Sequence, residues 1–447
     1  MPADPLSATA PSQHKLPDGW REVPLASVAE VRFSGVNKLS LPSEEPVRLC
    51  NYTDVYNNDC ITGDLEFMRA TATQPEIDRF GLHLGDVIIT KDSETPDDIG
   101  IAAVVDYTAP DLLCGYHLAL IRPRTAEVDP TFLAKQLRHH RLARYFGQQA
   151  NGLTRYGLPT AVVANAPLWL PEPVKQRAIG AFLRLVDEAI AKTEAVIAKL
   201  KQMRAGLLHD LLTRGLDEHG QLRDPIAHPE QFQDSPLLGR IPRGWEITEV
   251  MQLGDLVTGT TPPSFERSAW GESLPFVTPV EVSDEGEVLA PGRGLSEAGR
   301  KFSRELPGGS VLVVCIGSTL GKVAVAPWDC ATNQQINAII CAQRHDSLYV
   351  AAVVRQHIRQ LHRWAGLQAV PIVNKSQFGR MCVPVAPTEE QHRIAAVIAI
   401  QNKQIRDEHA VGEKLRLVRS GLMTDLLSGR VRVPEKALLQ TPATREE

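Results

Sequence analysis

The sequence predicts an α+β protein: two mixed α/β domains separated by two long antiparallel helices, arranged as a pseudo-two-fold tandem repeat. The first observation is that GLLHDLLTRG (206–215) returns as GLMTDLLSGR (421–430), with Asp210 and Asp425 215 positions apart. The same separation relates Gln176 to Gln391, so one register holds across some forty residues. The second is that LPDGW (16–20) returns as IPRGW (241–245), which marks the opposite end of each half.

Composition sets the broad class of the protein. The chain has 447 residues, enough for two to three domains, with 43% apolar and 23% charged residues. No apolar run approaches the roughly twenty residues that span a bilayer, and the first twenty residues lack the apolar core of a signal peptide, so we expect a cytoplasmic protein without a membrane segment. The seven cysteines are scattered singly, which predicts reduced thiols rather than disulfides or a zinc site.

The elements follow in the same order in each half. Residues 1–171 are predicted to form the first domain, with strands in VRLCNYTDVY, GDVIIT, IGIAAVVDY and YHLALIRP. Residues 172–217 form the first long helix, and residues 218–386 the second domain, with strands in LPFVTPVEV, SVLVVCIGS, KVAVAP and QINAIICA. Residues 387–430 form the second long helix, and 431–447 a tail.

The two long helices are predicted to pair with each other. The first carries an apolar residue at alternating steps of three and four, as in a coiled coil; these residues are Ile179, Phe182, Val186, Ala189, Thr193, Val196, Leu200, Met203 and Leu207. The second has Gln401, Gln404 and Glu408 at its middle, where the apolar stripe moves to Ile398 and Ile405. The alternative is that each helix only covers its own globule.

No stretch of the sequence predicts catalysis. GSTLGK (317–322) has one residue too few between its glycines for a phosphate-binding loop, and a hairpin turn is the expected structure. The motifs of a DNA amino-methyltransferase are missing, TPPS at Thr261 being the nearest string, and no Glu-x-Lys pair of a metal-dependent nuclease occurs. We therefore expect no catalytic residue and no metal site.

Two basic segments are the candidates for DNA contacts. Lys and Arg recur at three- and four-residue spacing within 132–147 and 349–366, which on single helices would place them on one face for phosphate contacts. A solvated helix surface is the alternative for either segment alone. The loops NGLTRYG and VPIVNKSQ that follow carry side chains able to reach bases. The candidate DNA-binding residues are Lys91, Lys135, Arg138, Arg141, Arg144, Asn151, Arg155, Tyr156, Lys322, Arg355, Arg359, Arg363, Asn374, Lys375 and Ser376.

The order of these segments, twice over, resembles the specificity subunits of type I restriction-modification systems. The resemblance covers nearly the whole chain, from LPDGW and IPRGW through PFVTPVEV, SVLVVCIGSTLGKVAV and TNQQINAII to PEPVKQRAI, PTEEQHRI and the two helix endings. It implies two target-recognition domains that each read one half of an asymmetric, bipartite site in double-stranded DNA. The helices would then act as the spacer and bind two methyltransferase subunits.

The resemblance also implies where the chemistry of such a complex resides. S-adenosylmethionine, ATP and Mg²⁺ are expected on partner subunits, the methyltransferases and a translocating nuclease (restriction) subunit, and no cofactor is expected in this chain. Two other classes stay open from the sequence. One is a DNA methyltransferase or nuclease whose catalytic part is unrecognised, and the other is a purely structural coiled-coil spacer, which the two folded globules oppose.

Overall fold

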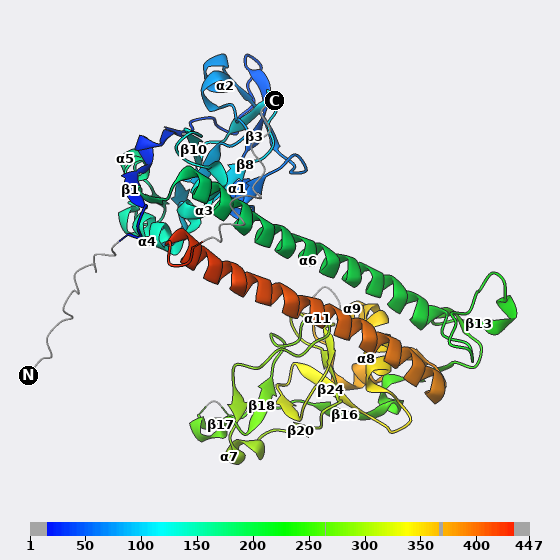
Figure 1. The fold of residues 1–447 in the computed structure, drawn as a ribbon. Coiled ribbons are helices and arrows are strands. Elements are labelled where there is room, and N and C mark those ends of the chain that lie inside the picture. Colours follow the sequence, from blue (N-terminus) through cyan, green and yellow to red (C-terminus); the bar gives the residue numbers. More distant parts are fainter. Residues whose placement is uncertain (1–15, 264, 366–369, 433–447) are drawn as a thin grey trace, which may run out of the picture. The chain divides into compact units, whose positions relative to one another are not determined.

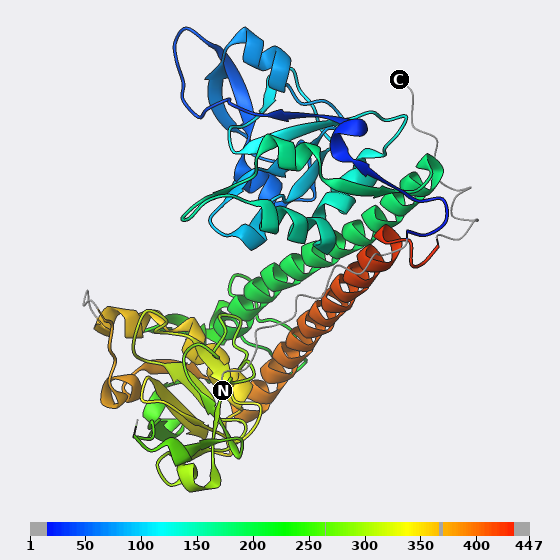
Figure 2. The same cartoon turned by 90° about the vertical axis from the view of Figure 1, so that its left-hand side faces the viewer.

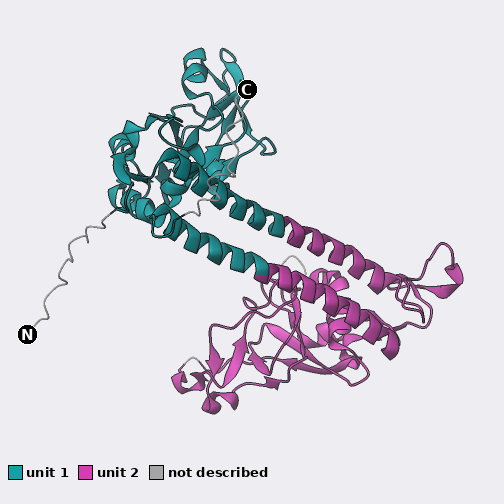
Figure 3. Ribbon diagram, viewed as in Figure 1, with its two compact units in different colours: residues 1–194, 411–447 teal, residues 195–410 magenta. Residues whose placement is uncertain are grey.

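The computed structural model describes residues 16–263, 265–365 and 370–432. The chain divides into two compact units (Figure 3): unit 1 contains residues 1–194 and 411–447, and unit 2 contains residues 195–410. Each long helix is continuous and contributes one half to each unit, α6 spanning Pro173–Thr213 and α11 spanning Thr388–Leu427.

Unit 1 is built on a five-stranded sheet of order β2-β10-β6-β8-β4, with a smaller sheet β5-β3-β9 beside it (Figure 1). Alternate residues of the central strands enter two cores: Val87 and Ile89 pack under the helices, and Ile88 packs against the smaller sheet. The elements are β1 (Arg21–Pro24), β2 (Ala29–Phe33), β3 (Glu45–Cys50), α1 (Tyr52–Asn57), β4 (Cys60–Ile61), β5 (Met68–Ala72), α2 (Gln74–Phe80), β6 (Val87–Thr90), β7 (Asp92–Ser93), β8 (Ala102–Val105), β9 (Leu112–Cys114), β10 (Leu118–Pro123), α3 (Pro130–Arg138), α4 (His140–Gln149), β11 (Tyr156–Gly157), α5 (Thr160–Ala164) and β12 (Pro167–Leu170).

Unit 2 repeats this frame with a four-stranded sheet of order β16-β24-β21-β22, and Val311 and Leu312 again face different cores. A second sheet has the order β17-β19-β18-β23-β20. The elements are β13 (Phe232–Ser235), β14 (Gly239–Pro242), β15 (Glu246–Glu249), β16 (Gly254–Thr258), β17 (Trp270–Gly271), β18 (Leu274–Val277), β19 (Gly294–Leu295), α7 (Glu297–Arg300), β20 (Glu305–Leu306), β21 (Val311–Val314), β22 (Val323–Val325), β23 (Cys330–Thr332), β24 (Ile336–Cys341), α8 (Ser347–Gln356), α9 (Arg359–Ala365), α10 (Lys375–Gly379) and β25 (Cys382–Val385).

The repeated glutamines explain why the two helices begin alike. In unit 1 the buried Gln176 side chain accepts from the backbone N–H of Asp129, 3.0 Å away, and donates to the carbonyl of Pro171. In unit 2 Gln391 makes the equivalent bonds to Asp346 and Ala386. Each glutamine thereby ties the start of a long helix to the N-cap of the first basic helix, α3 or α8.

The predicted antiparallel helices are confirmed. Within unit 1 the first half of α6 and the last half of α11 lie side by side (Figure 2), with Asp187 paired to Arg419 and Glu194 to Arg416. The detailed seam differs from the predicted one, because a 3.6-residue turn drifts away from a strict heptad. Phe182 and Val196 are 43% and 45% exposed, while Leu183 and Ile197 are buried. Ile398 and Ile405 are buried, as the sliding stripe of the second helix predicted.

The alternative, that each helix only covers its own globule, is wrong, because each helix enters the cores of both units. Ile179 and Leu183 of α6 and Leu426 and Leu427 of α11 enter the core of unit 1 together with the sheet. In unit 2 the other halves contribute Leu211, Leu212, Ile394 and Ile398 to its core. The helix halves are therefore part of each unit's own core as well as a pair.

Several local expectations are corrected or confirmed. The run VRLCNYTDVY is a strand only to Cys50, because Asn51 and Asp54 form a capping box that starts α1. GSTLGK forms the predicted turn between β21 and β22, with positive φ at Gly317 and Gly321. All seven cysteines are free thiols. Among the described residues no helix is long and apolar enough to cross a membrane.

Candidate nucleic-acid interface

The two central sheets have matching hydrogen-bond registers, so their loops can be compared position by position. In unit 1 Leu118 pairs with Thr90, and the N–H of Lys91 donates to the carbonyl of His117. In unit 2 Ile336 pairs with Val314, and the N–H of Cys315 donates to the carbonyl of Gln335. His117 and Gln335 are therefore equivalent, and so are Tyr116 and Gln334.

A third loop reaches the same sheet end in each unit. The N–H of Leu158 donates to the carbonyl of Lys91, and the N–H of Val373 donates to the carbonyl of Cys315. This register makes Arg155 of the 151–157 loop equivalent to Val370, and Asp92 equivalent to Ile316. Polar loops brought together by a rigid sheet are a usual location for binding residues.

Unit 1 gathers charged and aromatic side chains at this end, which we call the unit 1 loop cluster (Asp92, Tyr116, His117, Arg155 and Lys91). Arg155 Nη2 donates to Asp92 Oδ1 at 2.9 Å, and Asp92 Oδ2 lies 2.9 Å from His117 Nδ1. Lys91 Nζ donates to the carbonyl of Ser34 and lies 4.7 Å from the centre of the exposed Tyr116 ring. Partial burial lowers the pKa of Lys91.

Unit 2 places amide and apolar side chains at this sheet end, which we call the unit 2 loop cluster (Ile316, Gln334, Gln335, Val370 and Ile372). The first four hold the positions of Asp92, Tyr116, His117 and Arg155, and Ile372 pairs with Ile316 beside them. Gln334 is exposed and accepts from the Thr261 hydroxyl at 2.7 Å, and Gln335 accepts from the Asn333 side chain. Val370 and Ile372 are 52% and 46% exposed. The same frame therefore presents different chemistry in the two units.

The basic segments do not form the single cationic faces that the sequence predicted. His139 is extended, with ψ 140°, and splits the first segment into α3 and α4. The second segment is likewise divided, into α8 and α9. Lys135 and Arg138 therefore lie on a different helix from Arg141 and Arg144, and cannot share one helical face with them.

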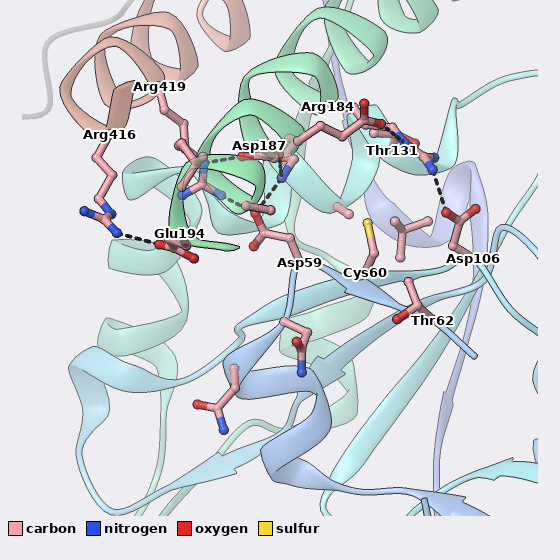
Figure 4. Close-up of a pocket in the computed structure, with 18 residues that line it drawn as sticks. Asp59, Cys60, Thr62, Asp106, Thr131, Arg184, Asp187, Glu194, Arg416 and Arg419 are labelled. Atoms are coloured by element: carbon pink, nitrogen blue, oxygen red, sulfur yellow. Dashed lines mark hydrogen bonds and ion pairs between the residues drawn. The ribbon is translucent and has the colours of Figure 1, made fainter. Parts of the chain in front are cut away.

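Lys135 and Arg138 belong to an internal charge cluster of unit 1 rather than to an exposed surface. Lys135 Nζ lies 2.9 Å from Asp59 and 2.5 Å from Asp187, with 6% of its side chain exposed. Arg138 pairs with Asp59 at 2.5 Å, and Arg419 of α11 reaches both aspartates (Figure 4). Burial by itself would raise the pKa of Asp59, but Lys135, Arg138 and Arg419 lower it to about 2. These cations join the globule to both helices.

Arg141 and Arg355 are also engaged within their units. Arg141 Nη2 donates to the carbonyl of Pro167 at 2.6 Å, its guanidinium lies 4.0 Å from the Trp169 ring, and burial lowers its pKa to about 10. Arg355 is the counterpart of Arg138, since their side chains donate to the first residues of equivalent strands, Val323 and Ala102. The guanidinium or ammonium groups of Lys135, Arg138, Arg141 and Arg355 thus have intramolecular partners, which corrects the expectation of a shared cationic face. Contact of these residues with DNA stays a prediction.

The other predicted residues stay at the surface or close to it. Arg144, Arg359 and Arg363 are exposed on α4 and α9. Lys322 is partly buried and lies 3.3 Å from Asp284, and Tyr156 is partly buried in β11. Asn374 caps α10 through the N–H of Gln377. Asn151 and Arg155 are exposed in their loop, and Lys375 and Ser376 are exposed at the start of α10, next to the exposed Asn374.

No group of three or more His, Cys, Asp or Glu side chains suited to a metal ion occurs among the residues that the structure describes. Sequence reasoning did not find Asp92, Tyr116, His117, Gln334 and Gln335. The available signal was their position, because each lies at or beside the end of a buried strand where the chain turns.

Comparison with known proteins identifies the family. Residues 242–410 match the family described as Type I restriction modification DNA specificity domain. The chain is 21% identical over 440 residues to the putative type I restriction enzyme MjaX specificity subunit of Methanocaldococcus jannaschii, covering 94% of this chain and 95% of the relative. Residues 242–410 thus match the specificity domain, and the chain is similar over nearly its whole length to a type I restriction-modification specificity subunit. The family that the sequence resemblance implied is thereby confirmed.

Further relatives agree with this assignment of the specificity subunit. The type I restriction enzyme HindI specificity subunit of Haemophilus influenzae is 27% identical over 198 residues, 43% of this chain and 42% of the relative. A crystal structure of the S subunit from M. genitalium has the same fold, with a TM-score of 0.58 at 14% identity, covering 94% of this chain and 98% of that chain. A second structure, from a study of complex assembly in a type I R-M system, gives a TM-score of 0.52 at 18% identity, covering 94% and 100%.

Proposed function

We propose that this specificity subunit reads an asymmetric, bipartite site in double-stranded DNA, one half with each unit, and docks two methyltransferase subunits. The observation that supports the proposal most directly is the repeated loop frame. Equivalent backbone positions carry Asp92, His117 and Arg155 in unit 1 and Ile316, Gln335 and Val370 in unit 2. Different side chains on one frame suit two different half-sites.

We further propose that the subunit has no catalytic activity of its own and works in the cytoplasm. Methyl transfer would belong to the methyltransferases with S-adenosylmethionine, and DNA cleavage to a restriction subunit with ATP and Mg²⁺. The repeated helices support two equivalent docking surfaces, because alike partners need alike surfaces related by an approximate two-fold axis. We assign the exposed polar residues of both loop clusters to base contacts, and Arg144, Arg359 and Arg363 to phosphates.

The first prediction tests this division of labour. The chain co-expressed with its methyltransferase should modify one asymmetric bipartite motif, whereas the purified chain alone should neither bind S-adenosylmethionine nor methylate DNA. Sequencing of methylated bases and calorimetric titration with the cofactor measure the two parts. Saturable cofactor binding by the isolated chain would contradict the proposal, and so would a contiguous motif.

The second prediction concerns the exposed arginines. Arg144→Ala and Arg359→Ala should each weaken DNA binding by the assembled complex and reduce the slope of log K against log salt by about one, because each removes one phosphate contact. The methylated motif should stay the same, since phosphate contacts carry no direct sequence information. Titrations at several salt concentrations, with Arg21→Ala as the exposed control, measure the effect; a changed motif would show that these residues read bases.

A further inference from the structure

Arg155 is an exposed arginine whose side chain contacts two less exposed side chains, those of Asp92 and His117. Its side chain is 59% exposed, whereas its partner Asp92 is only 16% exposed and His117 24%. Asp92 is held by its place in β7, which pairs with β11 through Ser93 and Tyr156, directly beside the arginine. A long side chain that would otherwise sample many rotamers is thus confined, which lowers the entropy lost on binding.

The hydrogen bonds leave a defined set of donors on the outer edge of Arg155. Asp92 accepts from Arg155 through Oδ1 and lies 2.9 Å from His117 through Oδ2, so both of its oxygens are engaged. His117 Nδ1 is also 3.2 Å from Arg155 Nη2, but one nitrogen cannot both donate to Asp92 and accept from Arg155. We place the Nδ1 hydrogen on the shorter contact, to Asp92. One Nη2 hydrogen, both Nη1 hydrogens and the Nε hydrogen of Arg155 then have no partner within the described residues.

This arrangement suits a base edge better than a phosphate. The carboxylate of Asp92 neutralises much of the arginine's charge, which weakens long-range attraction to phosphate, but two parallel N–H groups on neighbouring guanidinium nitrogens stay free. Guanine presents two acceptors, O6 and N7, at the spacing of such a pair, and the contact of arginine with them is the commonest specific one in the major groove. The equivalent residue in unit 2, Val370, offers no donor on its side chain.

We propose that Arg155 reads a guanine in the half-site of unit 1, and that Asp92 and His117 act as positioning residues for it. The inference rests on the proposed function and adds the base and the residue that reads it. It also assigns this contact to one half-site only, because unit 2 carries Val370 and Ile316 where unit 1 carries Arg155 and Asp92.

The test uses the full chain in complex with its methyltransferase. Arg155→Ala and Arg155→Gln should convert one guanine of one half-site into a tolerated mixture of bases, a loss of about tenfold or more in discrimination, while the other half-site stays unchanged. Asp92→Asn should keep the guanine but reduce discrimination several-fold. Arg21→Ala, which removes a comparably exposed arginine from β1, is the control and should leave the motif intact. Since Arg155 is exposed, thermal unfolding should not change.

A chemical probe gives a second readout. DNA that carries 7-deazaguanine in place of that guanine lacks N7, so the wild-type complex should bind it about tenfold more weakly, whereas the Arg155→Ala complex should bind both DNAs equally. If the wild-type motif is bipartite but has no guanine in either half-site, or if Arg155→Ala leaves it unchanged, the inference on Arg155 is overturned while the proposed function stands. If the wild-type complex modifies no bipartite motif, the proposed function fails and the inference with it.

Discussion

A chain that ends at residue 217, co-expressed with the methyltransferase, should direct methylation to a palindrome in which the half-site of unit 1 appears as an inverted repeat. Such a chain keeps the first globule and all of α6 but loses the segment of α11 that completes unit 1. Leu426 and Leu427 of that segment lie in the unit 1 core, and Arg419 pairs with Asp59 and Asp187.

A second copy can supply the missing segment. The 215-residue register places Leu211, Leu212 and Arg204 at the positions of Leu426, Leu427 and Arg419. Two truncated chains would therefore complete each other around a true two-fold axis, which is why the site becomes palindromic. The second helix, with Gln401, Gln404 and Glu408 at its middle, should self-pair less well.

Sequencing of methylated bases measures the outcome for the truncated chain. The matched control is the truncated chain with Arg204→Ala, which removes the cation offered to Asp59 and Asp187 and should lower dimer formation and methylation together. A motif that stays asymmetric and bipartite after loss of the second globule would refute the assignment of one half-site to each unit.

Asp59→Ala should lower the free energy of unfolding of unit 1 by about 3 kcal/mol near neutral pH. It leaves Lys135, Arg138 and Arg419 close together with one aspartate instead of two, and removal of one partner from a buried ion cluster costs about 3–5 kcal/mol. Asp106→Ala is the matched control, because its ion pair with Arg184 is about 40% exposed on both sides, and it should cost less than about 1 kcal/mol.

The same cluster should make stability depend on acid pH. The pKa of Asp59 is about 2 in the folded chain and below its ordinary value of 3.8, so the carboxylate stabilises the fold fully above about pH 4. This contribution is lost as pH falls through about 2. Urea unfolding at about pH 7 and about pH 3 should therefore show a smaller difference between the wild type and Asp59→Ala at the lower pH; an equal difference at both would contradict the ion-cluster assignment.

The sequence predicted the helices and the repeat well because both depend on residue spacing along the chain. The register of 215 located Gln176 and Gln391, and the structure gives these two side chains the same hydrogen bonds. Spacing within one segment also led to the wrong prediction that the basic residues of each segment share one helical face. It shows which side chains would share a face if the helix continued, but not that His139 is extended or that Asp59, 76 residues before Lys135, lies beneath it.

The unit 1 loop cluster could not be predicted from spacing either, because its residues are far apart in the sequence. Arg155 was visible as a basic residue in an exposed loop, but its partner Asp92 lies 63 positions away and His117 38. These three meet only because the register of β6, β10 and β11 brings their loops to one sheet end. Long-range pairing of this kind leaves no periodic trace in the sequence.

The glycine that follows each long helix has a consequence for chain connectivity. Gly215 lies against the ring of Trp245 and Gly429 against the ring of Trp20, both with positive φ and so little space that a Cβ atom would come within 2.9 Å of the rings. In unit 2 residues 216–244 connect the glycine to the tryptophan. In unit 1 the corresponding glycine and tryptophan lie near the two ends of the described chain, Gly429 near residue 432 and Trp20 near residue 16. A polypeptide that started at residue 241, ran to residue 432 and continued through a linker into residues 16–215 would keep these contacts in both units. The end of each repeat thus contacts the start of the other repeat in the same way, so a circularly permuted chain that begins with the second repeat should fold as this one does.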